Sequence, residues 1–323
     1  MALTDPSSFY KPFKYPWAIE FATQQEKIHW IEDEADLQED VNQWKAVAGI
    51  PDPLTANEKA HITQILRLFT QTDVSVAGNY VNLFLPLFPN NEIRSMLLSF
   101  AAREGIHQRA YALLNDTLGL AEGEYAAFLD YADMAEKVWF MEETNDVSTP
   151  EGIAKALAQA VCNEGMSLFS AFVMLKHYER FGKMKGMCKI VEWSVRDESQ
   201  HVLGMTKLFQ TFVEENPQVK TDQFKRSIYE MYRQAVDIED RVIDTCFSAG
   251  PISHLEASDM KLYIRFIADR RLEQLGLKAN WGIATNPLPW VDWVVSGDSH
   301  VNFFEQRVSD YNVDPFEGKS WWD

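Results

Sequence analysis

Two copies of one metal-ligand pattern, a glutamate followed three residues later by a histidine, lie 94 residues apart in sequence with helical character. The two copies are Glu104-Gly105-Ile106-His107 and Glu198-Ser199-Gln200-His201. A Glu and a His at this spacing on a helix project from one face and can reach the same metal ion. Two pairs therefore predict two metal ions. Four-helix bundles with a dinuclear centre take such a pair from each of two helices and one carboxylate from each of the other two.

Asp73 and Glu164 are the best candidates for these two additional carboxylates. Each is the lone charged residue of an otherwise uncharged helical stretch, residues 69–77 and 160–169. An unpaired charge is costly to bury, so a buried position would make each residue a ligand. A surface charge on a helix is an equally good interpretation of either residue alone. Their order in the chain relative to the two Glu-x-x-His pairs favours metal binding.

The predicted site thus contains four carboxylates and two imidazoles. Its members are Asp73, Glu104, His107, Glu164, Glu198 and His201. Oxygen donors with one nitrogen per ion suit iron or manganese better than zinc or copper. Four carboxylates neutralise two divalent ions, and bridging carboxylates can shift as the metals are oxidised. Such a site suits oxygen chemistry.

Long helices are expected to position these residues. Thr55, followed by Glu58 three residues later, predicts a capping box at the start of a helix whose apolar residues recur at helical spacing. Further helices are predicted at residues 92–118, 123–142, 150–180, 184–213, 221–246 and 256–276, separated by Pro, Gly or Asn. The sequence lacks convincing alternating strand patterns, so an all-α protein is expected.

Two terminal segments differ in composition from the rest of the chain. Residues 1–29 contain several prolines among aromatics and predict an irregular arm laid over the body. Residues 1–309 are expected to form a single helical domain that includes this arm. Residues 310–323 predict a C-terminal tail ending in Trp321-Trp322. The tail is either a docking segment or a segment that folds back onto its own subunit.

Composition narrows the classes of partner. The chain has 323 residues, with 30 Lys plus Arg against 48 Asp plus Glu and a formal net charge of −18. This balance argues against a nucleic-acid partner. The three cysteines form no close-spaced pair, which favours a reducing, cytoplasmic location over a disulfide framework. The sequence predicts neither a signal peptide nor a membrane span.

Over nearly its whole length the chain resembles the small, radical-generating subunit of class I ribonucleotide reductase. The resemblance rests on EGIHQRAY at residues 104–111, RDESQH at 196–201, and Trp30 followed by EDEAD at 32–36. YIRFIADR at 263–270 and NPLPW at 286–290 also look like family segments. The resemblance implies a ferritin-like four-helix bundle core with additional helices and a dinuclear metal site inside the bundle. The six residues of the predicted site match the family's metal ligands.

The resemblance also implies roles for residues outside the ligand set. Tyr111 matches the tyrosine that is oxidised to a stable radical, and it lies one helical turn after His107 on the same face. The alternative for Tyr111 is a core tyrosine with a satisfied hydroxyl. Asp197 is expected to accept a hydrogen bond from the His107 ring and to connect it to Trp30, forming the inner end of a radical-transfer path. Trp30 could otherwise serve ordinary packing.

The surroundings of Tyr111 must exclude water and reductants if it is to carry a radical. Leu168 and Phe172 fall on the ligand face of the Glu164 helix and are candidates for this wall, although core packing predicts the same residues. Ser194 stands where the family often has an aliphatic residue, so the sequence departs from the family pattern beside the expected radical site.

The tail departs from the family in being short. By resemblance it would dock on the large subunit and carry a tyrosine that relays the radical. Tyr311 is the candidate relay because no other tyrosine follows Tyr263, and Trp321 and Trp322 are candidate docking anchors. Tyr311 closely follows residues 303–308 and could instead belong to the folded body.

The resulting hypothesis is a ribonucleoside-diphosphate reductase small subunit. Its cofactor would be a dinuclear metal centre, with two iron ions first and two manganese ions or a manganese/iron pair as alternatives. The expected partners are the large catalytic subunit, a second copy of the chain as a homodimer, and an activating flavoprotein if the metals require one. Two other functions share the ligand set: a two-metal oxidase or monooxygenase with its own organic substrate, and a ferritin-like metal-storage protein.

Overall fold

Helix α3 (Ala56–Gly78) begins at the predicted capping box. The Glu58 backbone N–H donates to the Thr55 hydroxyl, and the Thr55 N–H donates to the Glu58 carboxylate. The computed structural model describes residues 2–143 and 145–295. Within these ranges the secondary structure is helical, with one isolated antiparallel bridge in place of any strand. The prediction of an all-α fold is confirmed.

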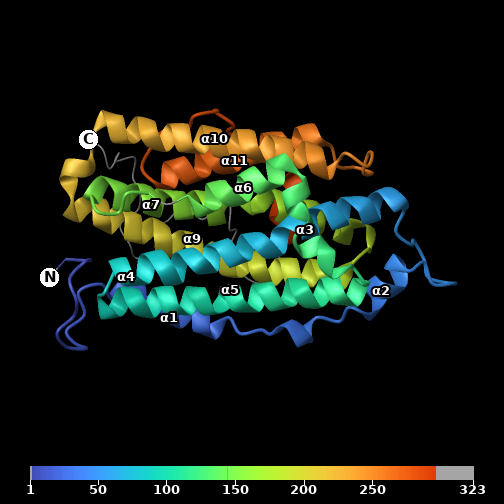
Figure 1. Ribbon diagram of the computed structural model, residues 1–323, viewed down its shortest axis with the longest axis horizontal. Helices are drawn as coiled ribbons and strands as arrows, with labels where there is room; N and C mark the ends of the chain where they lie inside the picture. The colour runs from blue at the N-terminus through green and yellow to red at the C-terminus, as the bar shows by residue number, and fades with distance from the viewer. Residues whose placement is uncertain (1, 144, 296–323) are drawn as a thin grey trace.

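Four helical segments run side by side along the long axis of the molecule (Figure 1). They are α3, α5 (Asn91–Leu118), α9 (Lys185–Glu215) and a composite segment made of α7 (Pro150–Cys162), the π-helical η5 (Asn163–Ser167) and α8 (Phe169–Lys176). Within this bundle α3 packs against α5 and α8, while α9 packs against α5, α7 and α8. The predicted site residues all lie on these four segments.

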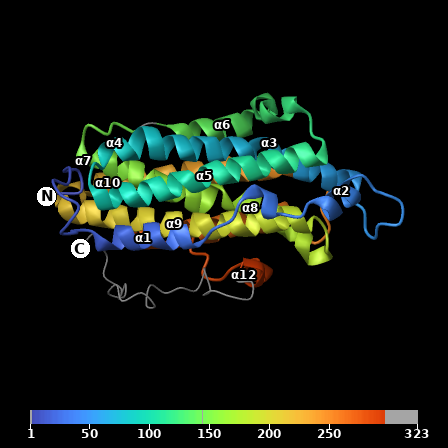
Figure 2. The ribbon, with the colours of Figure 1, turned by 90° about the horizontal axis from the view of Figure 1, so that it is seen from below.

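The remaining long helices cover the bundle from two sides. Helices α10 (Asp222–Cys246) and α11 (Ala257–Gln274) lie together on one side with α6 (Ala132–Glu142), whereas α1 (Pro16–Lys27) lies along α5 and α9 (Figures 1 and 2). Short helices complete the described chain: α2 (Gln38–Trp44), α4 (Leu85–Leu87), α12 (Pro289–Val295), η1 (Glu32–Glu34), η2 (Asn79–Phe84), η3 (Glu122–Tyr125), η4 (Ala127–Asp130), η6 (His177–Phe181) and η7 (Pro217–Val219). No helix among the described residues has both the length and the apolar character needed to cross a bilayer.

Three predicted segments differ from the structure. The arm at residues 1–29 is not irregular throughout, because Pro16 occupies the first turn of α1, where a proline costs no hydrogen bond. The predicted helix at 123–142 begins only at Ala132, since the exposed stretch before it buries a single side chain, Phe128. The predicted helix at 150–180 is interrupted by η5. The predicted domain boundary at residue 309 lies outside the described residues.

Candidate metal centre

The six predicted ligands come together in the middle of the four-helix bundle, and each of these residues is at most 2 % exposed. Helices α5 and α9 contribute the two Glu-x-x-His pairs, α3 contributes Asp73, and η5 contributes Glu164. Asp73 and Glu164 are therefore buried, and the interpretation of either as a surface charge is wrong. The structure thus brings the six predicted residues together in the interior.

Their donor atoms form two overlapping sets. Glu104, Glu164, Glu198 and His201 make one, and Asp73, Glu104 and His107 make the other; the atoms of each set lie within 4.8 Å of one another. Glu104 belongs to both. Glu198 also reaches toward both histidines, with Oε1 3.3 Å from His107 Nδ1 and Oε2 3.6 Å from His201 Nδ1. This arrangement offers two adjacent positions for cations, joined by two carboxylates.

Several buried atoms of this cluster have no hydrogen bond within the described part of the chain. They are Asp73 Oδ2, both carboxylate oxygens of Glu104 and of Glu198, and both ring nitrogens of His201. The 3.0 Å approach of His201 Nδ1 to Glu104 Oε1 lacks hydrogen-bond geometry. A buried polar group without a partner costs about 1–3 kcal/mol, and more when it is charged. Two divalent cations would satisfy the carboxylate oxygens and one ring nitrogen of His201, so the residues fit a dinuclear centre.

The pKa shifts within the cluster also indicate that its carboxylates need nearby positive charge. Burial raises the pKa of Asp73 well above its usual value. Burial, followed by the Glu198 charge, raises the pKa of Glu164 to about 7 despite the opposing His201 contact. Burial also opposes ionisation of Glu104, but the adjacent His107 and His201 rings more than offset it and lower its pKa to about 2. The carboxylates are thus stable as anions only beside positive charge, which imidazolium groups or metal ions can supply.

Asp197 connects this cluster to Trp30. Its buried carboxylate accepts hydrogen bonds from Trp30 Nε1 (2.7 Å), Gln25 Nε2 (2.8 Å) and Arg103 Nε (3.2 Å), and it lies 3.1 Å from His107 Nε2. Although burial raises its pKa, His107 first and then Arg103 and Trp30 lower the pKa of Asp197 to about 2. The Trp30 ring stacks on His107 with centroids 5.8 Å apart. The predicted contacts of Asp197 with His107 and Trp30 are present in the structure.

Tyr111 lies in a buried, mainly aromatic environment. Its hydroxyl donates to Ser194 Oγ at 3.1 Å, and its ring meets Phe69 edge to face with centroids 4.4 Å apart. Phe172 packs edge to face on Phe69 at 5.0 Å. Leu168 is also fully buried. Burial, together with the negative charge of Asp73, raises the pKa of Tyr111 well above its usual value, so the phenol keeps its proton.

Three residues at the site were not predicted from the sequence. The Tyr80 hydroxyl donates to Glu164 Oε2 at 2.6 Å, while Gln25 and Arg103 bind Asp197. Tyr80 and Gln25 come from segments far from their partners and carry no distinguishing spacing. Arg103 directly precedes Glu104 in the chain, and this position is the sequence feature that could have indicated its place at the site.

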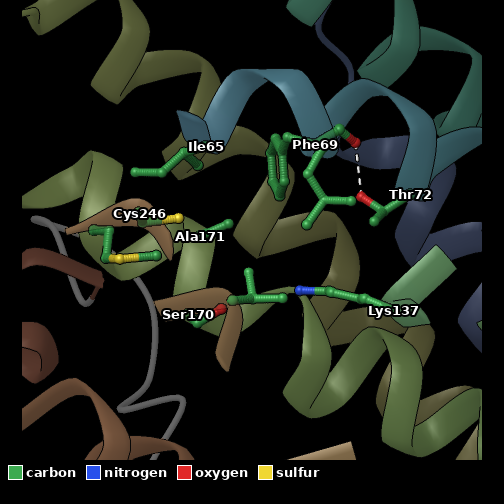
Figure 3. A pocket seen from close by; sticks show the side chains of 10 residues that line it. Ile65, Phe69, Thr72, Lys137, Ser170, Ala171 and Cys246 are labelled. Atoms are coloured by element: carbon green, nitrogen blue, oxygen red, sulfur yellow. Dashed lines mark hydrogen bonds between the residues drawn. The ribbon is translucent and has the colours of Figure 1, made fainter. Parts of the chain in front are cut away.

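A small cavity lies on the side of Phe69 that faces α6, α8 and α10 (Figure 3). Its volume is about 10 Å³, the lower limit for one water molecule. Lys137 lines it and forms a fully buried ion pair with Glu239 at 2.7 Å, and Ser170 donates to the same carboxylate at 2.6 Å. Lys137 Nζ also donates to the carbonyl of Ser167 at 2.5 Å. The cavity is too small for an organic substrate, and its ion pair connects α6, α10 and the end of η5.

The predicted tail residues Tyr311, Trp321 and Trp322 lie outside the described residues. Their roles as radical relay and docking anchors remain predictions.

Comparison with known proteins agrees with this geometry. The family model described as ribonucleotide reductase, small chain, matches residues 7–287. A probable ribonucleoside-diphosphate reductase small subunit of invertebrate iridescent virus 3 is 37% identical, covering 94% of this chain and 83% of its own. The ribonucleotide reductase R2 subunit from Clostridium botulinum shares the fold with a TM-score of 0.82, 22% identity, and coverage of 91% and 94% of the two chains. The dimanganese(II) form of Streptococcus sanguinis NrdF superposes with a TM-score of 0.76 at 16% identity, covering 90% of this chain and 100% of that one.

Proposed function

The chain belongs to the family of ribonucleotide reductase small subunits, and from this premise we propose that its buried cluster holds two metal ions that generate and store a radical. As a small subunit it is part of an oxidoreductase and implies a large-subunit partner, in which we place nucleotide binding and reduction. The observation that carries the proposal is the convergence of four carboxylates and two imidazoles whose buried atoms lack other partners.

Each side chain has a proposed task in holding the ions. Glu104 and Glu198 reach both donor sets and would bridge the ions, while Asp73 and Glu164 would each bind one. His107 and His201 would each supply one ring nitrogen. A bound pair of iron or manganese ions supplies the redox equivalents that activate oxygen.

Tyr111 is the proposed site of the stored radical. Oxidation removes one electron from its ring and the proton from its hydroxyl, which already donates to Ser194 Oγ. The packed rings of Phe69 and Phe172 exclude water from this phenol. The inner end of the transfer path to the large subunit would be His107, Asp197 and Trp30, through the contacts that Asp197 makes with both rings.

The identity of the ions and the assembly are further parts of the proposal. We propose two iron ions, with two manganese ions or a manganese/iron pair as the alternatives; the ligand types accept either metal. The dimanganese(II) neighbour supports manganese as an option. We also propose a cytoplasmic homodimer whose tail, with Tyr311 and Trp321-Trp322, meets the large subunit. An activating flavoprotein is a further proposed partner.

Family membership argues against the two other functions that share this ligand set. The cavity beside Phe69 is at the limit for one water molecule, so it offers no room for the organic substrate of a two-metal oxidase. A metal-storage protein would give no role to the Trp30–Asp197–His107 contacts.

Tyr111→Phe, with Tyr80→Phe as its matched control, tests the radical assignment. Both tyrosines are buried at the cluster, but Tyr80 donates to the ligand Glu164 and Tyr111 does not share this bond. After metal loading and exposure to oxygen, we expect a tyrosyl radical signal in electron paramagnetic resonance for the wild type and for Tyr80→Phe. Tyr111→Phe should bind the same amount of metal but give no such signal. A tyrosyl signal that survives in Tyr111→Phe and disappears in Tyr80→Phe would move the radical to Tyr80.

A further inference from the structure

Two π-helical turns come together beside the Glu164 carboxylate. The turn η2 begins with Asn79-Tyr80, and η5 begins with Asn163-Glu164. Both asparagines donate from Nδ2 to the carbonyl of Met141 in the last turn of α6, at 3.1 Å and 3.2 Å. Carbonyls in the last turn of a helix have no partner within that helix, so this one is available to both side chains. The next residue of each turn then meets its counterpart, because the Tyr80 hydroxyl donates to Glu164 Oε2 at 2.6 Å.

The packing around Tyr80 fixes the direction of its hydroxyl. The residue is only 1 % exposed. Its ring contacts Phe84 of the same turn, Phe100 of α5 and His201 of α9, with centroids 6.2, 6.1 and 5.9 Å away. A hydroxyl at 2.6 Å from a carboxylate oxygen makes a charge-assisted hydrogen bond, which is about twice as strong as a bond between neutral groups. Glu164 is therefore held from outside the cluster by a rigid donor.

Tyr80 supports the donor set that contains His201. Both ring nitrogens of His201 lack a hydrogen bond within the described residues, so no such bond fixes this imidazole there. His107 of the other set differs, since Asp197 Oδ2 lies 3.1 Å from its Nε2. The two halves of the cluster are thus supported unequally. Support reaches one half through its histidine and the other half through the carboxylate of Glu164.

We propose that Tyr80 is a positioning residue that holds Glu164 ready for the ion beside His201 and so sets the affinity of that position. The inference rests on the proposed function. Without the hydrogen bond the carboxylate can turn, and restoring its orientation opposes metal binding. Loss of a partner that orients a ligand typically lowers metal affinity about 10–100-fold. An excess of metal still fills both positions, so the Tyr80→Phe variant keeps the radical on Tyr111.

Calorimetric titration of the full-length, metal-free protein with manganese(II), in the absence of oxygen, measures both positions. Tyr80→Phe should weaken the binding of one ion about 10–100-fold and change that of the other by less than about two-fold. The matched control is Tyr178→Phe, which removes the hydroxyl of an equally buried tyrosine whose partner is His61 instead of a ligand. It should leave both affinities unchanged. Equal affinities in the wild type and Tyr80→Phe would overturn the proposal.

A second variant separates hydrogen bonding from packing. Tyr80→p-aminophenylalanine carries an N–H donor where the hydroxyl was, whereas phenylalanine keeps the ring without a donor. The amino variant should therefore recover most of the affinity that Tyr80→Phe loses. Equal weakening in the two variants would assign Tyr80 a packing role and would also overturn the proposal.

Anomalous diffraction at a limiting concentration of manganese(II) identifies the position that changes. In Tyr80→Phe we expect the peak beside Asp73 and His107 to keep its height and the peak beside Glu164 and His201 to fall. An equal fall of both peaks would contradict a role confined to Glu164.

Metal-free crystals separate this inference from the proposed function. The Glu164 carboxylate should turn from its wild-type orientation in Tyr80→Phe and keep that orientation in Tyr178→Phe. An unchanged Glu164 in Tyr80→Phe would overturn the positioning role. A wild-type protein that binds no metal at the cluster would overturn the proposed function, whereas the metal-free crystals would still decide whether Tyr80 holds Glu164.

Discussion

The hydrogen bond between Tyr111 and Ser194 sets the immediate environment of the proposed radical. In the reduced protein the phenol donates to Ser194 Oγ at 3.1 Å. Once the phenol has lost its proton, its oxygen can only accept, and the serine hydroxyl can rotate to become the donor. Because Ser194 is fully buried, this hydroxyl does not exchange its role with bulk water. Ser194 therefore acts as a positioning residue for the phenol and its radical.

Ser194→Ala should change the radical without removing it. We expect the largest g-value of the Tyr111 radical in high-field electron paramagnetic resonance to rise, because a phenoxyl oxygen that accepts no hydrogen bond has a higher value. Loss of one buried hydrogen bond should lower the free energy of unfolding by about 1 kcal/mol.

Ser194→Thr, which retains the hydroxyl, is the control and should keep the wild-type g-value. Identical g-values in the wild type and Ser194→Ala would show that the serine does not contact the radical.

At the residue scale, spacing in the sequence predicted which residues share one helix face. It did not predict which residues of other helices contact them. The two Glu-x-x-His pairs were visible because i, i+3 geometry fixes their relation. Tyr80 was not, because its bond to Glu164 depends on how two distant helices pack. The same holds for Gln25, whose contact with Asp197 requires α1 to lie against α9.

At the element scale, η5 determines where the Glu164 carboxylate points. A π-helical turn inserts one extra residue into the helix and is often found at functional sites. Arg271 of α11 donates from Nε to the carbonyl of Gly165 at 2.8 Å and lies over Phe169 at 5.5 Å. Burial lowers the pKa of this guanidinium to about 10, so it remains charged at neutral pH. Arg271 thus stabilises the turn that holds Glu164.

Gly165→Ala tests this support. A Cβ at Gly165 would lie 2.6 Å from Arg271 Nε and 3.2 Å from Val202 Cγ2, so the arginine must move. Overpacking costs typically about 1–3 kcal/mol, more than the roughly 0.5–1 kcal/mol that alanine gains over glycine in a helix. We expect a net loss of about 1–2 kcal/mol in denaturant unfolding and weaker metal binding.

Gly123→Ala is the matched control, because a Cβ there meets nothing within 4 Å. It should leave the metal affinity unchanged and should not lower the free energy of unfolding. Full metal affinity in Gly165→Ala would mean that η5 positions Glu164 without help from Arg271.

The buried side chain of His61 on α3 should make the stability of the protein depend on pH. Its ring lies 2.9 Å from the Tyr178 hydroxyl and packs on Phe247. Burial, and then the charge of His177, lowers its pKa from 6.5 to about 3. Below pH 6.5 the unfolded chain binds a proton that the folded chain does not, so stability present above pH 6.5 is lost as pH falls. From pH 6.5 to 5 this amounts to about 2 kcal/mol.

His61→Gln removes this titration. The difference in urea unfolding free energy between the wild type and this variant should therefore shrink by about 2 kcal/mol from pH 7 to pH 5. Exposed His29→Gln, compared in the same way, should show no such trend. A pH-independent difference for His61→Gln would mean that His61 is protonated equally in both states.

Element boundaries were predictable where capping and apolar periodicity agree, as at Thr55 and along α5 and α9. They were not predictable at η5, because a π-helical turn depends on packing against α9 and α11 rather than on local propensity. Helix α1 was missed because the prolines of residues 1–29 suggested an irregular chain, although Pro16 is compatible with the first turn of a helix.

At the scale of the whole molecule, the surrounding helices isolate the cluster from solvent. Four helical segments supply the six candidate ligands, while α1, α6, α10 and α11 cover the bundle (Figures 1 and 2). Burial of four carboxylates in such an interior is unfavourable unless cations compensate them. Two metal ions at this one interior position, as proposed, would supply that compensation, and the fold would be organised around them.

Anomalous diffraction from crystals of the full-length protein loaded with iron or with manganese tests most directly whether two metal ions occupy the cluster. Data collected on both sides of each metal's absorption edge locate each ion and identify its element. We expect two anomalous peaks, bridged by Glu104 and Glu198, with Asp73 and His107 on one ion and Glu164 and His201 on the other. A single peak, or peaks away from these six side chains, would contradict the account.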